Sequence, residues 1–149
     1  MTRSACHCGA VRIAVNPAPK TVFDCNCSIC RRYGGLWAYT FRPDHKGKSD
    51  IEAIIVQGAD AVESYVWGDK WSAVWRCETC GCVMYGTSID KPQIILSLNA
   101  RMFVDFDPAS VTLQRIDNAH TGRFWTRADA EIMKGGHPPM PPPGPDDWR

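Results

Sequence analysis

The sequence predicts a mainly β domain with antiparallel strands and little helix. Seven to nine short stretches of the 149-residue chain are rich in β-branched or aromatic residues or alternate in polarity, and turn-forming residues separate them. A helical pattern is clearest in one segment near the C-terminus, at 126–133. The length and the 44% hydrophobic content suit one soluble domain with a buried core.

The first half of the chain supplies three expected strands, at 9–15, 36–41 and 51–57, and residues 21–24 lead into the central cysteine run. The first of these alternates, with its valine and isoleucine side chains on one face. The last is a short apolar run, which a buried helical segment would fit as well. Between the strands at 9–15 and 36–41 we expect a short helical turn, with Ser28 as its N-cap and Gly34 and Gly35 at its end.

The second half supplies four more expected strands, at 61–67, 70–76, 93–98 and 111–116. The turn formed by Gly68 and Asp69 predicts that the first two pair as a hairpin. Three tryptophans, Trp67, Trp71 and Trp75, lie around this hairpin. We expect them in the core, although they could also form a wall beside a metal site.

The expected domain organisation has three parts. Residues 1–125 form the β domain, and 126–133 form a short C-terminal helix. The remaining residues, 134–149, hold six prolines and three glycines, so they cannot build a packed element. They are expected to form a flexible tail of polyproline character.

Charge and hydropathy exclude two classes of partner. The net charge of +1 gives no bulk attraction to nucleic acid or to a membrane surface. No apolar run approaches the roughly 20 residues that span a bilayer, and the first residues lack the apolar region of a signal peptide. We therefore expect a cytoplasmic protein, and in that reducing compartment clustered cysteines favour metal binding over disulfides.

Eight cysteines form three clusters, which are Cys6 and Cys8; Cys25, Cys27 and Cys30; and Cys77, Cys80 and Cys82. A C-x-x-C-G turn such as 77–81 is a common half of a closed four-cysteine zinc site. The free pair outside the central triplet, Cys6 and Cys8, is the expected other half. Such a site would link the N-terminus to the middle of the chain and close a loop of about seventy residues. A link across a long loop stabilises the fold, so we expect this site to be structural.

The central triplet, with spacing C-x-C-x-x-C, offers a second metal three ligands and leaves a fourth position open. If water or a substrate thiol fills that position, the site can activate a nucleophile. If Cys82 fills it, the site is closed and structural; an empty or oxidised triplet is a third possibility. Cys82 lies two residues beyond Cys80, so on an extended strand it could sit near either cluster.

These motifs resemble the glutathione-dependent formaldehyde-activating (GFA) family, also called the S-(hydroxymethyl)glutathione synthase family. The resemblance rests on C-H-C-G at 6–9, C-x-C-S-x-C-R-R at 25–32 and W-R-C-x-x-C-G at 75–81, and it covers about residues 2–125. It implies an Mss4-like zinc domain, which is an antiparallel β fold. Cys82 departs from the simplest pattern of the family.

The resemblance also implies site roles. Structural zinc would be held by Cys6, Cys8, Cys77 and Cys80, and a second, catalytic zinc by Cys25, Cys27 and Cys30. Glutathione would attach to the second zinc through its sulfur and add to formaldehyde, giving S-(hydroxymethyl)glutathione. Classified in reverse, this reaction is that of a carbon–sulfur lyase.

Three residues near the triplet are candidates for substrate binding. Arg31 and Arg32 could pair with the carboxylates of glutathione, or they could be ordinary solvated charges. Trp37 follows the glycine turn closely and could line the pocket. Two other functions remain open: a non-catalytic zinc module that binds a protein partner, and a glutathione carrier without turnover. The sequence predicts no oligomeric state.

Overall fold

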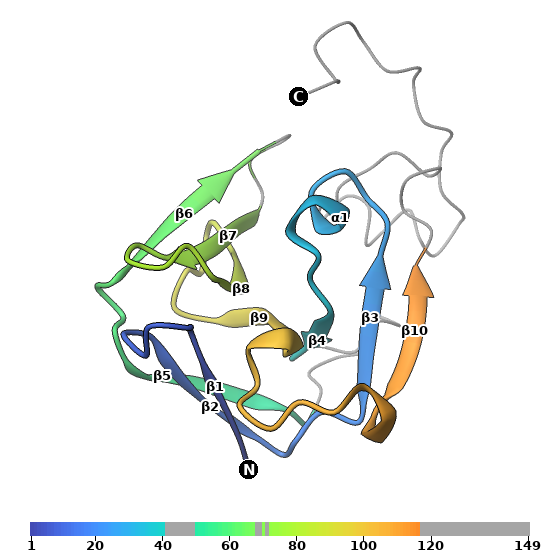
Figure 1. Cartoon of the computed structure of the whole chain (residues 1–149). Helices are drawn as coiled ribbons and strands as arrows, with labels where there is room; N and C mark the ends of the chain where they lie inside the picture. The colour runs from blue at the N-terminus through green and yellow to red at the C-terminus, as the bar shows by residue number, and fades with distance from the viewer. Residues whose placement is uncertain (41–49, 68–69, 71, 117–149) are drawn as a thin grey trace, which may run out of the picture.

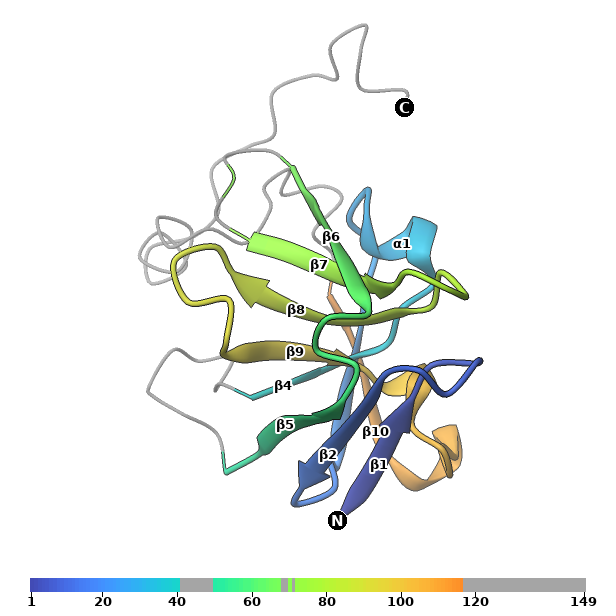
Figure 2. The ribbon, with the colours of Figure 1, turned by 90° about the vertical axis from the view of Figure 1, so that its left-hand side faces the viewer.

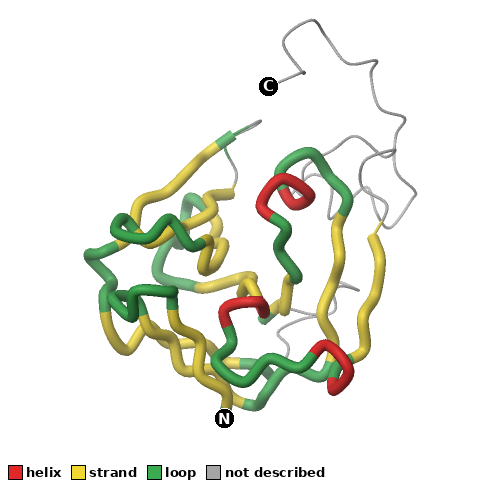
Figure 3. Tube along the Cα trace, viewed as in Figure 1, coloured by secondary structure: helices red, strands yellow, loops and turns green. Residues whose placement is uncertain are grey.

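The computed structural model describes residues 1–40, 50–67, 70 and 72–116. Within these residues the chain forms ten strands, one short α-helix and two 3₁₀ helices (Figures 1 and 3). The strands are β1 Thr2–Ala5, β2 Arg12–Asn16, β3 Thr21–Cys25, β4 Trp37–Tyr39, β5 Glu52–Gln57, β6 Val62–Val66, β7 Ser72–Cys77, β8 Val83–Ser88, β9 Ile95–Asn99 and β10 Thr112–Ile116. The helices are α1 Cys30–Tyr33, η1 Ala100–Met102 and η2 Pro108–Ser110. The expected mainly β fold with little helix is confirmed.

The strands form two sheets (Figure 2). The smaller has the order β1-β2-β5, and the larger has the order β10-β3-β4-β9-β8-β7-β6. Every pair of described strands is antiparallel except β3 with β10, which run parallel. The expected antiparallel arrangement is thus observed for every pair but this one. Parallel neighbours need a long crossover, and here most of the domain lies between the two strands in sequence.

The observed strands agree with most of the expected ones. The ambiguous run 51–57 is strand β5, and the hairpin of β6 and β7 forms with Val66 opposite Ala73. The strand expected at 9–15 begins later, at Arg12, because the residues before it turn at Gly9, which has a positive φ of 78°. The expected helix 126–133, the tail 134–149 and Trp71 lie outside the described residues.

Three of the observed strands were not predicted: β1, β3 and β8. All six residues of β8 are buried, because β7 and β9 flank it and both faces of the sheet are covered there. A strand that is buried on both faces shows no alternation of polarity. Gly86 in its centre faces Ser97 closely, since a Cβ there would lie 2.6 Å from the Ser97 hydroxyl oxygen. The same glycine weakens the strand signal in the sequence.

The large sheet has a different cluster of buried side chains on each face. Opposed residues of an antiparallel pair point to the same face, and neighbours along a strand point to opposite faces. Ala38 and Leu98 therefore share the face that packs on the main core with Ile13 of the small sheet. Trp37 and Phe23 share the other face, where Trp37 belongs to a second cluster with Cys25.

In the described ranges, no helix has the length and apolar character needed to cross a membrane.

Candidate metal centres

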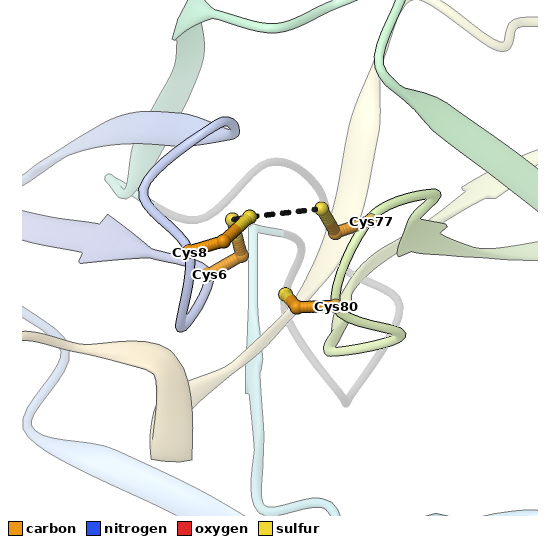
Figure 4. A group of neighbouring side chains, drawn as sticks. All are labelled: Cys6, Cys8, Cys77 and Cys80. Atoms are coloured by element: carbon orange, nitrogen blue, oxygen red, sulfur yellow. Dashed lines mark hydrogen bonds between the residues drawn. The ribbon is translucent and has the colours of Figure 1, made fainter.

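The first candidate centre joins the two sheets through four cysteines (Figure 4). Cys6 and Cys8 belong to the turn between β1 and β2, whereas Cys77 ends β7 and Cys80 lies in the turn after it. Their four Sγ atoms lie within 4.8 Å of one another. The structure thus brings together the four cysteines that the sequence analysis assigns to one metal site.

The spacing of these sulfur atoms fits a tetrahedral metal. The Sγ atoms of Cys6 and Cys8 are 3.5 Å apart, and those of Cys8 and Cys77 are 3.7 Å apart. These distances are far from the roughly 2.05 Å of a disulfide, and all four thiols are free. Four sulfurs at about 2.3 Å from a zinc ion would be spaced by about 3.8 Å, so little rearrangement is needed to hold one.

The backbone of both halves is shaped for this cluster. The amide of Gly9 donates to the Cys6 carbonyl at 3.0 Å, and the amide of Gly81 donates to the Cys77 carbonyl at 2.9 Å. Both glycines have positive φ angles, 78° and 73°, which other residues adopt at a cost. In addition, the Val11 amide donates to Cys6 Sγ at 3.2 Å, a contact that stabilises a thiolate.

The second candidate centre is the triplet at the end of β3. Cys25 is the last residue of that strand, Cys27 lies in the following turn, and Cys30 begins α1. Their Sγ atoms also lie within 4.8 Å of one another. Among the described residues, no further Cys, His, Asp or Glu joins this group. The triplet therefore offers three ligands from a single segment of chain.

The short helix holds this turn in shape. The Arg31 amide donates to the Cys27 carbonyl at 3.1 Å, and Gly34 ends the helix in the left-handed conformation with φ 60°. The expected N-cap is wrong: Ile29 occupies the N-cap position, and no side-chain hydrogen bond caps the helix. The first turn is held by the backbone and by the cysteine cluster instead of by the Ser28 hydroxyl.

Cys82 lies with the four-cysteine cluster and not with the triplet. It packs against the main core, and its carbonyl accepts a 2.9 Å hydrogen bond from the Cys77 amide. A hydrogen bond from the His7 amide would lower the pKa of the Cys82 thiol, but burial and the neighbouring Cys80 outweigh it and raise that pKa. The triplet packs in the second cluster, on the opposite face of the sheet from Cys82. Cys82 is therefore not placed to be a fourth ligand of the triplet.

The three thiols of the triplet differ in the direction in which their pKa values are shifted. Hydrogen bonds from Cys25 and Cys30 lower the pKa of Cys27 to about 3. Hydrogen bonds with Cys25 and Cys27 raise the pKa of Cys30, and the hydrogen bond with Cys27 raises the pKa of Cys25. By itself, the triplet thus favours one thiolate flanked by two neutral thiols. A metal ion that binds all three sulfurs would displace the remaining protons.

Aromatic side chains belong to the same cluster of buried residues as the triplet. Trp37 is buried beside Cys25, and the partly buried Tyr33, Tyr39 and Trp67 pack against the same cluster. Burial raises the pKa of the Tyr39 phenol, and the neighbouring Cys30 raises it further, so this phenol is neutral. The sequence did not identify Tyr39, although it shares the strand face of Trp37 at a spacing of two. It favoured a core position for Trp67, and this side chain is partly buried against the second cluster, to which the triplet also belongs.

The two arginines of α1 are both exposed, but they differ in their contacts. Arg32 donates to the Ser28 carbonyl at 2.7 Å and thereby closes the turn. Arg31 has no ion-pair partner among the described residues. A third arginine, Arg76, lies on the sheet face of Val74 and pairs with Glu63 at 2.9 Å. Of these three guanidinium groups, Arg31 is therefore the one without such a contact among the described residues.

Comparison with known proteins decides the family. The model of the family described as "Glutathione-dependent formaldehyde-activating enzyme" matches residues 1–110, which include all eight cysteines. The chain belongs to this family. A protein of Halomonas elongata named "Putative glutathione-dependent formaldehyde-activating enzyme" is 35% identical over 66 residues. That match covers 44% of this chain and 40% of the relative, so the chain matches well under half the length of that protein.

A solved structure also resembles this member of the GFA family. The crystal structure of a protein from Rhodobacter sphaeroides superposes with a TM-score of 0.52 and 28% sequence identity. The match covers 75% of this chain and 99% of that protein. The fold is therefore shared over nearly the whole length of the neighbour.

Proposed function

We propose that this protein is a zinc-dependent carbon–sulfur lyase that forms or cleaves a thiol–aldehyde adduct, such as S-(hydroxymethyl)glutathione. The family name supports glutathione and formaldehyde as the reactants. The observation that carries the proposal is the triplet of Cys25, Cys27 and Cys30, whose three sulfurs converge without a fourth ligand among the described residues. Three protein ligands are typical of reactive zinc sites, whereas four are typical of structural ones.

The two clusters would hold one zinc ion each and have different tasks. In the four-cysteine cluster the ion would stabilise the contact between the sheets. In the triplet the ion would supply positive charge that keeps an incoming thiol deprotonated at neutral pH. A cytoplasmic location would keep the eight cysteines reduced, as both clusters require.

The residues around the triplet have proposed roles in binding and orientation. Arg31, with Arg32 beside it, would attract a carboxylate of glutathione to the rim of the site. Tyr39 and Trp37 would exclude water from the thiol, and a dry site strengthens electrostatic contacts with the bound sulfur. Because formaldehyde is small and electrophilic, bringing the two reactants together supplies much of the rate enhancement.

The reaction balances without any oxidant. The thiolate sulfur forms a bond to the carbonyl carbon, and the π electrons of the C=O bond move to the oxygen. The proton that the thiol released then ends on that oxygen, which gives the hydroxymethyl adduct. Cleavage is the same sequence in reverse.

The variant Cys27→Ser tests the proposal. We expect it to lose metal from the triplet and to lose the acceleration of adduct formation, which NMR with ¹³C-formaldehyde and glutathione measures. Cys82→Ser is the matched control, because this thiol lies outside the triplet. If Cys27→Ser forms the adduct as fast as the unaltered protein, the triplet is not the reactive site. A protein that binds glutathione tightly but never changes the rate would be a carrier.

A further inference from the structure

The indole of Trp37 is a buried hydrogen-bond donor without a partner. The side chain is 3% exposed, and its Nε1 has no hydrogen-bond acceptor among the described residues. Trp75, which packs on the opposite face of the sheet, differs because its Nε1 donates to the Thr87 hydroxyl at 2.9 Å. Leaving a buried donor unsatisfied is costly, so such a group in a native protein requires an explanation.

The strands β3 and β4 place this donor beside the triplet. Trp37 lies opposite Phe23, and Cys25 follows Phe23 by two residues, so its side chain points to the same face of the sheet. Trp37 and Cys25 belong to the same cluster of buried side chains. The indole is therefore a direct part of the surroundings of the triplet.

The nitrogen edge of the indole is turned toward the cysteine end of this strand pair. A Cβ built on Gly35 would lie 2.9 Å from Trp37 Cε2 and 3.2 Å from its Nε1. Gly35 comes two residues before Trp37, so the antiparallel register carries it toward Cys25. The Gly35 amide also donates to the Cys30 carbonyl at 3.4 Å. The absence of a side chain at Gly35 is what allows the indole to lie there.

We propose that Trp37 donates a hydrogen bond from Nε1 to the sulfur of the substrate thiolate at the triplet, and thereby positions that sulfur for addition to the aldehyde. The indole N–H is a donor only, so its partner must be an acceptor, and an anionic sulfur is such an acceptor. A hydrogen bond to a charged group is stronger than one between neutral groups. The inference rests on the proposed function, because it requires a thiol to reach the triplet.

Trp37→Phe tests this inference through binding. The variant removes the N–H and keeps an aromatic ring, and we expect it to weaken the binding of glutathione to the zinc-loaded full chain by about 10- to 100-fold. Trp75→Phe is the matched control, because it removes an indole N–H that already has a partner; calorimetry should find its glutathione affinity within about twofold of the unaltered protein. Should Trp37→Phe fail to fold, a benzothiophene side chain at this position keeps the shape and lacks the N–H.

The indole N–H signals give a readout that does not depend on turnover. The chain has six tryptophans, and the signal that disappears in Trp37→Phe identifies that of Trp37. On addition of glutathione, or of 2-mercaptoethanol as a simpler thiol, we expect the Trp37 proton to shift downfield as it gains an acceptor. A thiol that binds without moving this signal, or that binds Trp37→Phe as tightly as the unaltered protein, would overturn the inference.

The same experiment separates this inference from the proposed function. If thiols bind and shift the Trp37 signal but adduct formation is not accelerated, the hydrogen bond is supported and the proposed function fails. If adduct formation is accelerated while the signal stays fixed, the proposed function stands and the hydrogen bond does not. If neither thiol binds the zinc-loaded protein, both are wrong.

Discussion

The Asn99 side chain joins three backbone segments, and its removal should destabilise the whole domain. Its amide oxygen accepts from the amides of Leu36 at 3.4 Å and Arg101 at 3.2 Å, and its nitrogen donates to the Val83 carbonyl at 2.9 Å. These partners lie just before β4, in η1 and in β8, so one buried amide fixes the strand that carries Trp37.

The expected cost follows from these contacts. Asn99→Ala leaves two N–H groups and one carbonyl without their partner, at a position where Asn99 is 3% exposed and water cannot replace it. At about 1 kcal/mol for each hydrogen bond, the variant should lose about 3 kcal/mol of its free energy of unfolding. With a dependence on urea of about 2 kcal/mol per molar, the midpoint of unfolding falls by about 1.5 M.

Urea denaturation of the zinc-loaded protein, followed by tryptophan fluorescence, measures this change. The matched control is Gln57→Ala, which removes an exposed amide with two long hydrogen bonds of 3.4 Å, and it should cost less than about 0.5 kcal/mol. A loss below about 1 kcal/mol for Asn99→Ala would show that the buried amide does not hold the strands together, and the reasoning would be refuted.

Three further predictions concern metal, packing and pH. Cys77→Ser should lower the zinc content measured by atomic emission from two ions to one and the unfolding free energy by several kcal/mol, whereas two retained ions would exclude a four-cysteine site. Gly35→Ala should displace the Trp37 indole, because the new Cβ would lie 2.9 Å from it; the Trp37 indole signal should shift, and an unchanged spectrum would contradict the packing. Burial raises the pKa of Tyr85 to about 12, so its stabilising effect is complete below pH 10 and is lost as the pH rises through 12. Stability measured between pH 9 and 12 should therefore fall more steeply for the unaltered protein than for Tyr85→Phe, and equal slopes would contradict this.

Ligand spacing explains why the metal clusters could be predicted from the sequence. A pair such as Cys77 and Cys80 directs two sulfurs to one point whatever the rest of the fold does, and the glycine after it marks the turn. The close spacing of Cys25, Cys27 and Cys30 likewise predicts that their three sulfurs lie together. Such motifs act within a few residues, so the chain itself contains the information.

The features that the sequence could not predict depend on tertiary contacts. Strand β8 is buried on both faces and lacks the alternation that reveals a half-buried strand. The position of Cys82 depends on which face of the sheet each cluster occupies, because strand geometry alone allows either. The packing of Tyr39 and Trp67 in the cluster of the triplet also depends on tertiary contacts, since Tyr39 lies in β4 and Trp67 follows the end of β6.

The position of the four-cysteine cluster has a consequence for how the protein could evolve. Its cysteines come from the turn of the small sheet and from the knuckle between β7 and β8, so this cluster ties together segments that are distant in the chain. The three cysteines of the triplet, by contrast, come from one short segment of the chain. If the triplet is the thiol site proposed above, changes around it can alter which thiol or aldehyde is accepted while the architecture stays intact.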